Sequence, residues 1–149
     1  MTENEKKLLH KELQLLDSAA KVLSDVMHIC KRIGLKKEYS LEELINLEAL
    51  TSRFARLSDL LIRKIFRLID KLDYEPQATV RDSINRAEKI GIIENAMLFA
   101  VIRETRNAIA HEYLLEDLSD LYKEVFNNTP LLLKTVERVK KYCRRYETL

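Results

Sequence analysis

The chain contains very few residues that turn a backbone, with two glycines (Gly34 and Gly91) and two prolines (Pro76 and Pro130) in 149 residues. A β-sandwich or barrel needs many turns, and turns draw heavily on glycine and proline. Since 46% of the residues are hydrophobic and 34% are charged, the composition is instead typical of long amphipathic helices. We therefore expect an all-α fold in which residues 1–149 form a single domain with a sizeable core.

Helix start and stop signals divide the first half of the chain. Thr2 with Glu5, and Ser40 with Glu43, have the spacing of capping boxes, which mark helix starts. Gly34 suits the residue that follows a helix C-terminus. Apolar residues at steps of three and four then predict a second helix up to about position 73, where the sequence Asp-Tyr-Glu-Pro breaks it.

The second half is divided in the same way. A short helix is expected over 79–89 and a longer one over about 93–113, with a loop and restart over 114–120. Thr129-Pro130 suits the N-cap and first position of a last helix that runs to Arg145. Together these signals predict an antiparallel bundle of four long helices plus one or two short helices.

The first helix carries two adjoining apolar stripes, which is more than one packing seam needs. The second stripe is either buried between two helices of the same chain or faces a second subunit. The first stripe contains Leu9, Leu13, Leu16, Ala20, Leu23, Met27 and Cys30, and the second contains Leu8, Leu15, Ala19, Val22, Val26, Ile29 and Ile33.

Charge and motif content exclude several classes of protein. A net charge of +2 is too small for binding a long duplex through charge alone. No apolar run approaches ~20 residues, so we expect no membrane span, and the polar start Met-Thr-Glu-Asn-Glu-Lys-Lys is unlike a signal peptide. Cys30 lies in an apolar stripe and is expected to be a small buried hydrophobe. Together the lack of a membrane span and of a signal peptide and the buried cysteine predict a cytoplasmic protein. No glycine-rich phosphate loop or zinc pattern occurs, and His10 and His28 lack partners at metal-ligand spacing, so we expect no metal or other cofactor.

The segment Arg106-Asn107-Ala108-Ile109-Ala110-His111-Glu112-Tyr113 places a cation, an amide, an imidazole and a phenol within eight residues. Arginine binds phosphate and stabilises negative charge, and histidine moves protons near neutral pH. These two side chains are the minimum needed to cleave RNA without a metal.

Helical spacing predicts two faces for this segment. One face is expected to pack on the rest of the bundle and contains Leu98, Ile102, Thr105 and Ile109. The opposite face is expected to carry Arg103, Arg106, Asn107, Ala110 and His111, and to continue toward the N-terminus with Ala96, Phe99 and Ala100. Such a continuation would place apolar residues where a monomer meets solvent.

The order Arg106-x4-His111-x-Tyr113 resembles the R-x4-H-x-Y signature of HEPN domains (higher eukaryotes and prokaryotes nucleotide-binding), and most of all their HepT-like toxin branch. The similarity extends over nearly the whole chain. The segment Leu47-Glu48-Ala49-Leu50-Thr51-Ser52-Arg53-Phe54-Ala55-Arg56-Leu57-Ser58-Asp59 resembles the second helix of that branch, and Ala87-Glu88-Lys89-Ile90-Gly91-Ile92-Ile93 resembles the segment before its motif helix.

The resemblance implies an HEPN-like helical domain and a homodimer in which two motif helices face each other across a cleft. It implies a toxin with metal-independent endoribonuclease activity on cellular RNA, held in check by a nucleotidyltransferase antitoxin. In some members that partner is thought to attach AMP to the tyrosine of the motif, which corresponds to Tyr113.

The chemistry of RNA cleavage assigns a role to each motif residue. His111 can accept the proton of the ribose 2′-hydroxyl or protonate the leaving oxygen, and Arg106 would neutralise charge on the phosphoryl oxygens. Asn107 and Arg103 are supporting residues on the same face. Because one chain offers one motif histidine, an acid and a base on opposite sides of the phosphate would require both subunits.

Two other readings stay open at this stage. The chain could be a non-catalytic module that presents a substrate or nucleotide to a nucleotidyltransferase, although a scaffold would not need the imidazole. It could also be a plain helical dimer with an accidental motif. The basic C-terminal segment is either an RNA-binding surface or an ordinary solvated helix end, and it contains Arg138, Lys140, Lys141, Tyr142, Arg144, Arg145 and Tyr146.

Overall fold

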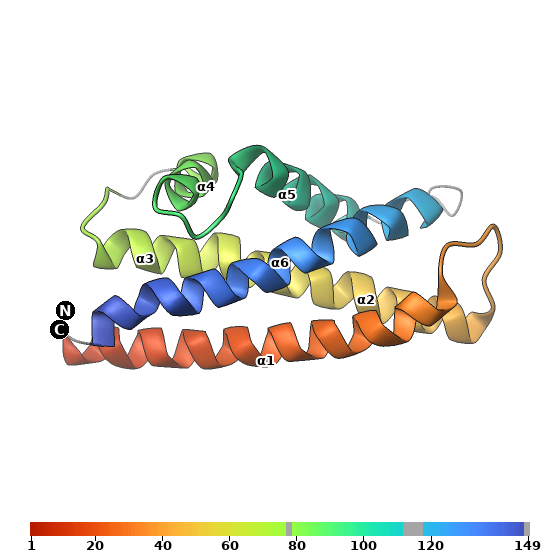
Figure 1. Ribbon diagram of the computed structural model, residues 1–149, viewed down its shortest axis with the longest axis horizontal. Helices are drawn as coiled ribbons and strands as arrows, with labels where there is room; N and C mark the ends of the chain where they lie inside the picture. Colours follow the sequence, from red (N-terminus) through yellow and green to blue (C-terminus); the bar gives the residue numbers. More distant parts are fainter. Residues whose placement is uncertain (77–78, 112–117, 148–149) are drawn as a thin grey trace.

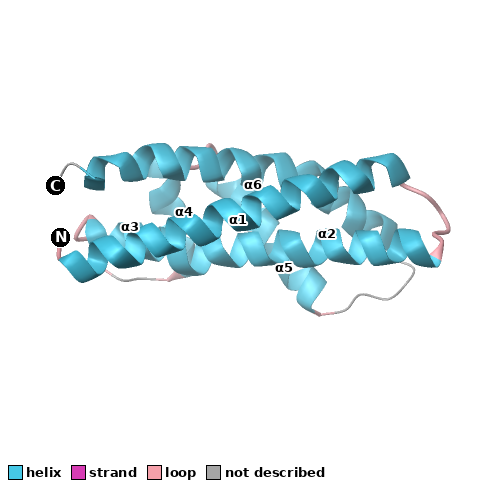
Figure 2. Ribbon diagram, turned by 90° about the horizontal axis from the view of Figure 1, so that it is seen from below, coloured by secondary structure: helices cyan, strands magenta, loops and turns pink. Residues whose placement is uncertain are grey.

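The computed structural model describes residues 1–76, 79–111 and 118–147, and these residues form helices and loops with no strand among them (Figure 2). This confirms the all-α expectation. In chain order the segments are α1 (Glu3–Ile33), α2 (Leu41–Asp59), the π-helical segment η1 (Leu60–Ile65), α3 (Phe66–Leu72), α4 (Val80–Lys89), α5 (Ala96–Ala110) and α6 (Leu118–Glu147). Within the described ranges, no helix has the length and apolarity required to cross a membrane.

Long helical rods form the body of the molecule (Figure 1). The two chain ends lie at the same end of the body, so α1 and α6 run antiparallel, and the continuous rod α2–η1–α3 packs on α1 and crosses behind α6 in the view of Figure 1. α5 packs on α2 and α6, and α4 packs on α3 and η1, on the side of this rod that faces away from α1.

Local signals placed most helix ends correctly. The predicted capping boxes at Thr2 and Ser40 are both formed, and Thr79 forms a third with Asp82 at the start of α4. Gly34 follows α1 with φ +70°, a left-handed backbone that other residues rarely adopt. The predicted break after position 72 is also present, and the chain turns there through Tyr74 at φ +61°.

The predicted start of the last helix at Thr129-Pro130 is wrong, because α6 runs without interruption from Leu118 to Glu147. Pro130 lacks an N–H and so removes one hydrogen bond, at a cost of about 3 kcal/mol in a helix interior. The Thr129 hydroxyl is fully buried and donates to the Val125 carbonyl at 2.7 Å. Burial of α6 residues on both sides of the proline, with Leu132 and Val136 beyond it, outweighs the lost bond.

The two apolar stripes of α1 differ in how far they are buried. The first stripe faces the core, where Leu9, Leu16 and Leu23 are buried, and Cys30 is buried there as expected. The second stripe is not buried between helices of this chain along its length. Leu8, Leu15 and Ile29, seven or fourteen residues apart, are exposed at 43%, 41% and 49%.

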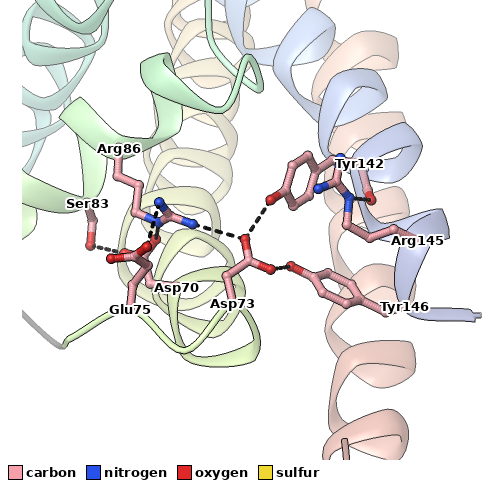
Figure 3. A network of polar contacts seen from close by, with 8 residues as sticks. All are labelled: Asp70, Asp73, Glu75, Ser83, Arg86, Tyr142, Arg145 and Tyr146. Carbon is pink, nitrogen blue, oxygen red and sulfur yellow. Dashed lines mark hydrogen bonds and ion pairs between the residues drawn. The ribbon is translucent and has the colours of Figure 1, made fainter. Parts of the chain in front are cut away.

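A network of polar side chains joins the end of α3 to α4 and α6 (Figure 3). The Asp73 carboxylate accepts hydrogen bonds from the hydroxyls of Tyr142 and Tyr146, at 2.5 and 2.6 Å. It also accepts one from Arg86 of α4 at 3.2 Å. Burial and the bonds to Asp73 raise the pKa of both phenols, so both stay protonated donors at neutral pH.

Arg86 supplies the positive charge of this network. Besides Asp73 it pairs with Asp70 at 3.2 Å and with Glu75 at 3.1 Å. The Ser83 hydroxyl donates to Asp70 at 2.9 Å, while burial raises the pKa of that carboxyl. A single guanidinium thus offsets three carboxylates gathered at one end of the molecule.

This network also involves the basic C-terminal segment. Tyr142 and Tyr146 bind Asp73 instead of standing free as stacking platforms. Arg138 and Lys140 pair with carboxylates elsewhere in the chain. Tyr142 and Tyr146 are therefore engaged in the fold, whereas Lys141 and Arg144 are exposed.

Replacement of Asp73 by alanine should lower the free energy of unfolding by roughly 3–5 kcal/mol, because it leaves Arg86 and two phenols without their shared acceptor. Urea denaturation followed by circular dichroism measures the change. The matched control is Asp17→Ala, which removes an exposed ion pair with Lys140 and should cost no more than about 1 kcal/mol. Equal effects of the two substitutions would contradict the role given to Asp73.

Candidate functional site

The motif helix α5 begins later than the sequence predicts. Asn95 caps it by accepting hydrogen bonds from the backbone N–H groups of Met97 at 2.8 Å and Leu98 at 3.4 Å. Ile93, the expected start, is instead buried in the connection that follows α4. The helix ends at Ala110, with His111 as its C-cap, although the sequence predicts helix up to residue 113. Residues 112 and 113 lie outside the described residues.

The buried face of α5 also differs from the expected one. Ile102 and Thr105 are buried as predicted. Phe99, expected to face away from the bundle, is only 3% exposed and packs on Phe66 with ring centroids 5.3 Å apart. Leu98, expected in the core, is 43% exposed. The helix is thus rotated toward Phe99, because a large aromatic ring fills the space beside α3 better than a leucine does.

This rotation carries Arg106 to the edge of the core. Its Nε donates to Asp59 Oδ1 at 2.6 Å and its Nη2 donates to Oδ2 at 2.9 Å, a bidentate pair. Hydrogen bonding to Asp59 raises the pKa of the guanidinium further above its usual range. Among the described residues, no hydrogen bond joins Arg106 to Asn107 or His111.

Asp59 is the last residue of α2 and precedes the π-helical segment η1. Residues Leu61, Ile62 and Ile65 of η1 are buried. A π turn inserts one extra residue per hydrogen-bonded ring, which shifts the phase of the helix, and such turns occur often at functional sites. The shift allows the rod to bury apolar residues after Asp59 while Asp59 itself faces α5.

The other described site residues lie on α5 or at its C-cap, and no hydrogen bond joins their side chains to Arg106. His111 is exposed at the C-cap of α5, where its backbone N–H donates to the Asn107 carbonyl at 3.1 Å and to the Ala108 carbonyl at 3.3 Å. Asn107 is half-buried and Arg103 is exposed. Tyr113, the predicted AMP acceptor, lies outside the described residues.

A groove of about 570 Å³ borders a different face of α5, next to the start of α6. Its wall combines apolar and acidic residues, namely Val101, Glu104, Thr105, Ala108, Asp120, Leu121 and Glu124. Three carboxylates repel phosphate, so this groove does not suit a nucleic acid strand. The cationic side of α5 is the side that carries Arg103 and Arg106.

Comparisons of the chain with protein-family models, with curated proteins and with solved structures found no match. Within the described ranges, no group of three or more His, Cys, Asp and Glu side chains is placed to hold a metal ion. The site is therefore interpreted from its own residues.

Asp59 is the site residue that sequence reasoning missed. In the sequence it is only the last residue of the segment that resembles the second helix of the HepT-like branch. A usable signal was present, because Asp59 is the only acidic residue between Glu48 and Asp70, a stretch that contains five arginines and lysines. An isolated acid among bases is a candidate for holding one of them, but its actual partner is 47 positions away.

The rotation of α5 predicts unequal effects for two neighbouring substitutions. Phe99→Ala should destabilise the fold by roughly 3–5 kcal/mol, as expected for an aromatic side chain removed from a core. Leu98→Ala should cost less than about 1 kcal/mol, because the side chain is largely exposed. Thermal or urea denaturation of both variants measures the difference, and a larger cost for Leu98→Ala would restore the face expected from sequence.

Proposed function

We propose that the protein is a metal-independent endoribonuclease of the HEPN type, acting as the toxin of a toxin–antitoxin pair. The proposal is carried by one observation. The motif arginine, Arg106, is fixed by a carboxylate of α2, and the helix that carries Arg106 ends in an exposed histidine, His111. The all-helical architecture and the order of the motif residues are compatible with an HEPN-like bundle.

The proposed reaction uses the ribose 2′-hydroxyl as the nucleophile. His111 removes its proton or, in the partner subunit, protonates the 5′-oxygen as the P–O bond breaks. Arg106 and the exposed Arg103 stabilise charge on the non-bridging oxygens, and Asn107 donates to a phosphate oxygen. The products carry a 2′,3′-cyclic phosphate and a free 5′-hydroxyl.

The expected result with purified protein is cleavage of single-stranded RNA that persists in EDTA and leaves 2′,3′-cyclic phosphate ends. His111→Ala should lose roughly 10²-fold or more in rate, the scale of a lost general acid or base, and Arg106→Gln should also lose activity. His28→Ala is the matched control, because His28 is exposed on α1. Loss of all activity in EDTA would refute the mechanism, and a fully active His111→Ala would refute the site.

We further propose a homodimer that brings two α5 helices together. Met97, Leu98 and Val101 are exposed apolar residues on the motif helix itself, at 79%, 43% and 38%. Phe99 is not part of this patch, because it is buried within one chain. An interface through this patch would supply the second histidine that the reaction needs.

Light scattering at micromolar concentration should return about twice the chain mass of 17.5 kDa. Val101→Glu should shift the protein toward the monomer, because it places a charge in an apolar contact. Ile45→Glu, at an exposed position of α2, is the matched control and should leave the dimer intact. A monomeric wild-type protein would contradict both the dimer and a shared site.

The proposed partner is a nucleotidyltransferase antitoxin that attaches AMP to Tyr113, which places a phosphate and a nucleoside two residues past His111. The competing function is a non-catalytic module that presents a nucleotide to that same partner. The exposed His111 favours the nuclease, since a scaffold has no use for a proton-transfer group at this position. The His111→Ala cleavage assay separates the two.

A further inference from the structure

Asp59 holds two arginines, and only one of them belongs to the motif. Its Oδ1 lies 2.6 Å from Nε of Arg106 and 3.8 Å from Nε of Arg63. Arg63 lies in η1, four residues after Asp59. One carboxylate between two guanidinium groups leaves the cluster with a net positive charge, next to the predicted catalytic helix.

The exposures of the three side chains differ in a way that suits anion binding. Arg106 is 23% exposed, Asp59 is 35% exposed and Arg63 is 64% exposed. A pair that is this accessible contributes little to stability, so its main effect is on orientation. Asp59 occupies Nε and Nη2 of Arg106, which fixes the plane of the guanidinium and directs its remaining N–H donors away from the carboxylate.

The π-helical segment accounts for the position of Arg63. Arg63 follows Asp59 by four positions, a spacing that brings two side chains together on one face of a helix. Leu61, Ile62 and Ile65 bury the inner side of η1, so Arg63 is left on the outer side beside Asp59. The four-residue spacing and the burial of the inner side of η1 thus place a second cation beside the same carboxylate.

We propose that Asp59 is a positioning residue that fixes Arg106 and holds Arg63 beside it, so that the two arginines bind neighbouring phosphates of one RNA strand. The inference rests on the proposed ribonuclease function. It adds Arg63 as an RNA-binding residue that the motif does not contain, and it assigns Asp59 the role of orienting both arginines.

The sign of the Asp59→Asn effect discriminates positioning from simple charge. Removal of a negative charge beside a phosphate site should strengthen RNA binding if Asp59 only repels the ligand. If Asp59 positions the arginines, Asp59→Asn should weaken binding of a 2′-O-methyl RNA oligonucleotide roughly tenfold, as for a lost charge-assisted interaction. This probe lacks the 2′-hydroxyl nucleophile, so binding is measured without cleavage.

Fluorescence anisotropy at a series of salt concentrations tests Arg63 separately. Arg63→Gln should reduce the slope of log K against log salt by about 0.7, the value for one phosphate contact on a single strand. Lys64→Gln is the matched control, because Lys64 is an exposed cation of the same segment and should leave the slope unchanged. Asp17→Asn, which removes an exposed pair with Lys140, controls for the general loss of an acid.

Arginine Nε–Hε NMR signals provide a readout that does not depend on activity. Arg106 should give a protected signal that Asp59→Asn abolishes, and the oligonucleotide should shift the signals of Arg63 and Arg106 together. Unchanged or tighter binding by Asp59→Asn, an unchanged salt slope in Arg63→Gln, or no binding by the wild type would each overturn the inference. Binding with the expected dependence but no cleavage of ordinary RNA would overturn the ribonuclease proposal and leave the phosphate site standing.

Discussion

The carboxylate of Asp73 is the interaction on which the arrangement of the helices depends. It ends the α2–η1–α3 rod, and it is bound there by two hydroxyls of α6 and by the guanidinium of α4. A buried carboxylate in this position is costly unless all of its partners are present. The network therefore favours a single placement of α4, and α5 follows α4 after a short connection that contains Ile92 and Ile93, both buried. The orientation of the motif helix is in this way linked to a cluster near the opposite end of the rod.

A second carboxylate, Asp59, orients a side chain of the candidate site, whereas Asp73 holds helices of the fold together. Both accept bonds from arginine, but their surroundings differ. Asp73 is 15% exposed and shares its charge with two phenols, whereas Asp59 is 35% exposed and pairs with the cations of Arg63 and Arg106. The first arrangement is closed to ligands and serves stability. The second leaves guanidinium donors free at the surface, where a phosphate could reach them.

Features set by local chemistry were predictable from the sequence, and features set by distant contacts were not. The capping boxes at Thr2 and Ser40 depend on residues three apart, so the sequence reveals them. The end of α1 at Gly34 is of the same kind. The helix start predicted at Pro130 is wrong because burial along α6 outweighs a local signal. Local spacing alone cannot weigh that tertiary contribution.

The rotation of α5 also depends on tertiary contacts that local spacing does not reveal. Periodicity placed Leu98, Ile102 and Thr105 on one face, but the choice between Leu98 and Phe99 at its edge depends on Phe66, more than thirty positions away. The same holds for Asp59 and Arg106, which are 47 positions apart and meet only where α5 packs on α2. The motif residues were thus found by their order in the chain, while the residue that orients Arg106 could be found only in three dimensions.

The two halves of the motif differ in what fixes them, and this difference bears on the proposed mechanism. Arg106 is oriented within one chain by a bidentate bond to Asp59. His111 is exposed at the helix end, and its side chain has no hydrogen-bonding partner among the described residues. A phosphate-binding group benefits from being fixed before the substrate arrives, because the ordering cost is then met during folding. A proton-transfer group must instead meet the reacting oxygen, whose position is defined only once RNA lies between two subunits. Under the proposed function, the dimer is therefore needed to place His111, whereas each chain prepares Arg106 by itself.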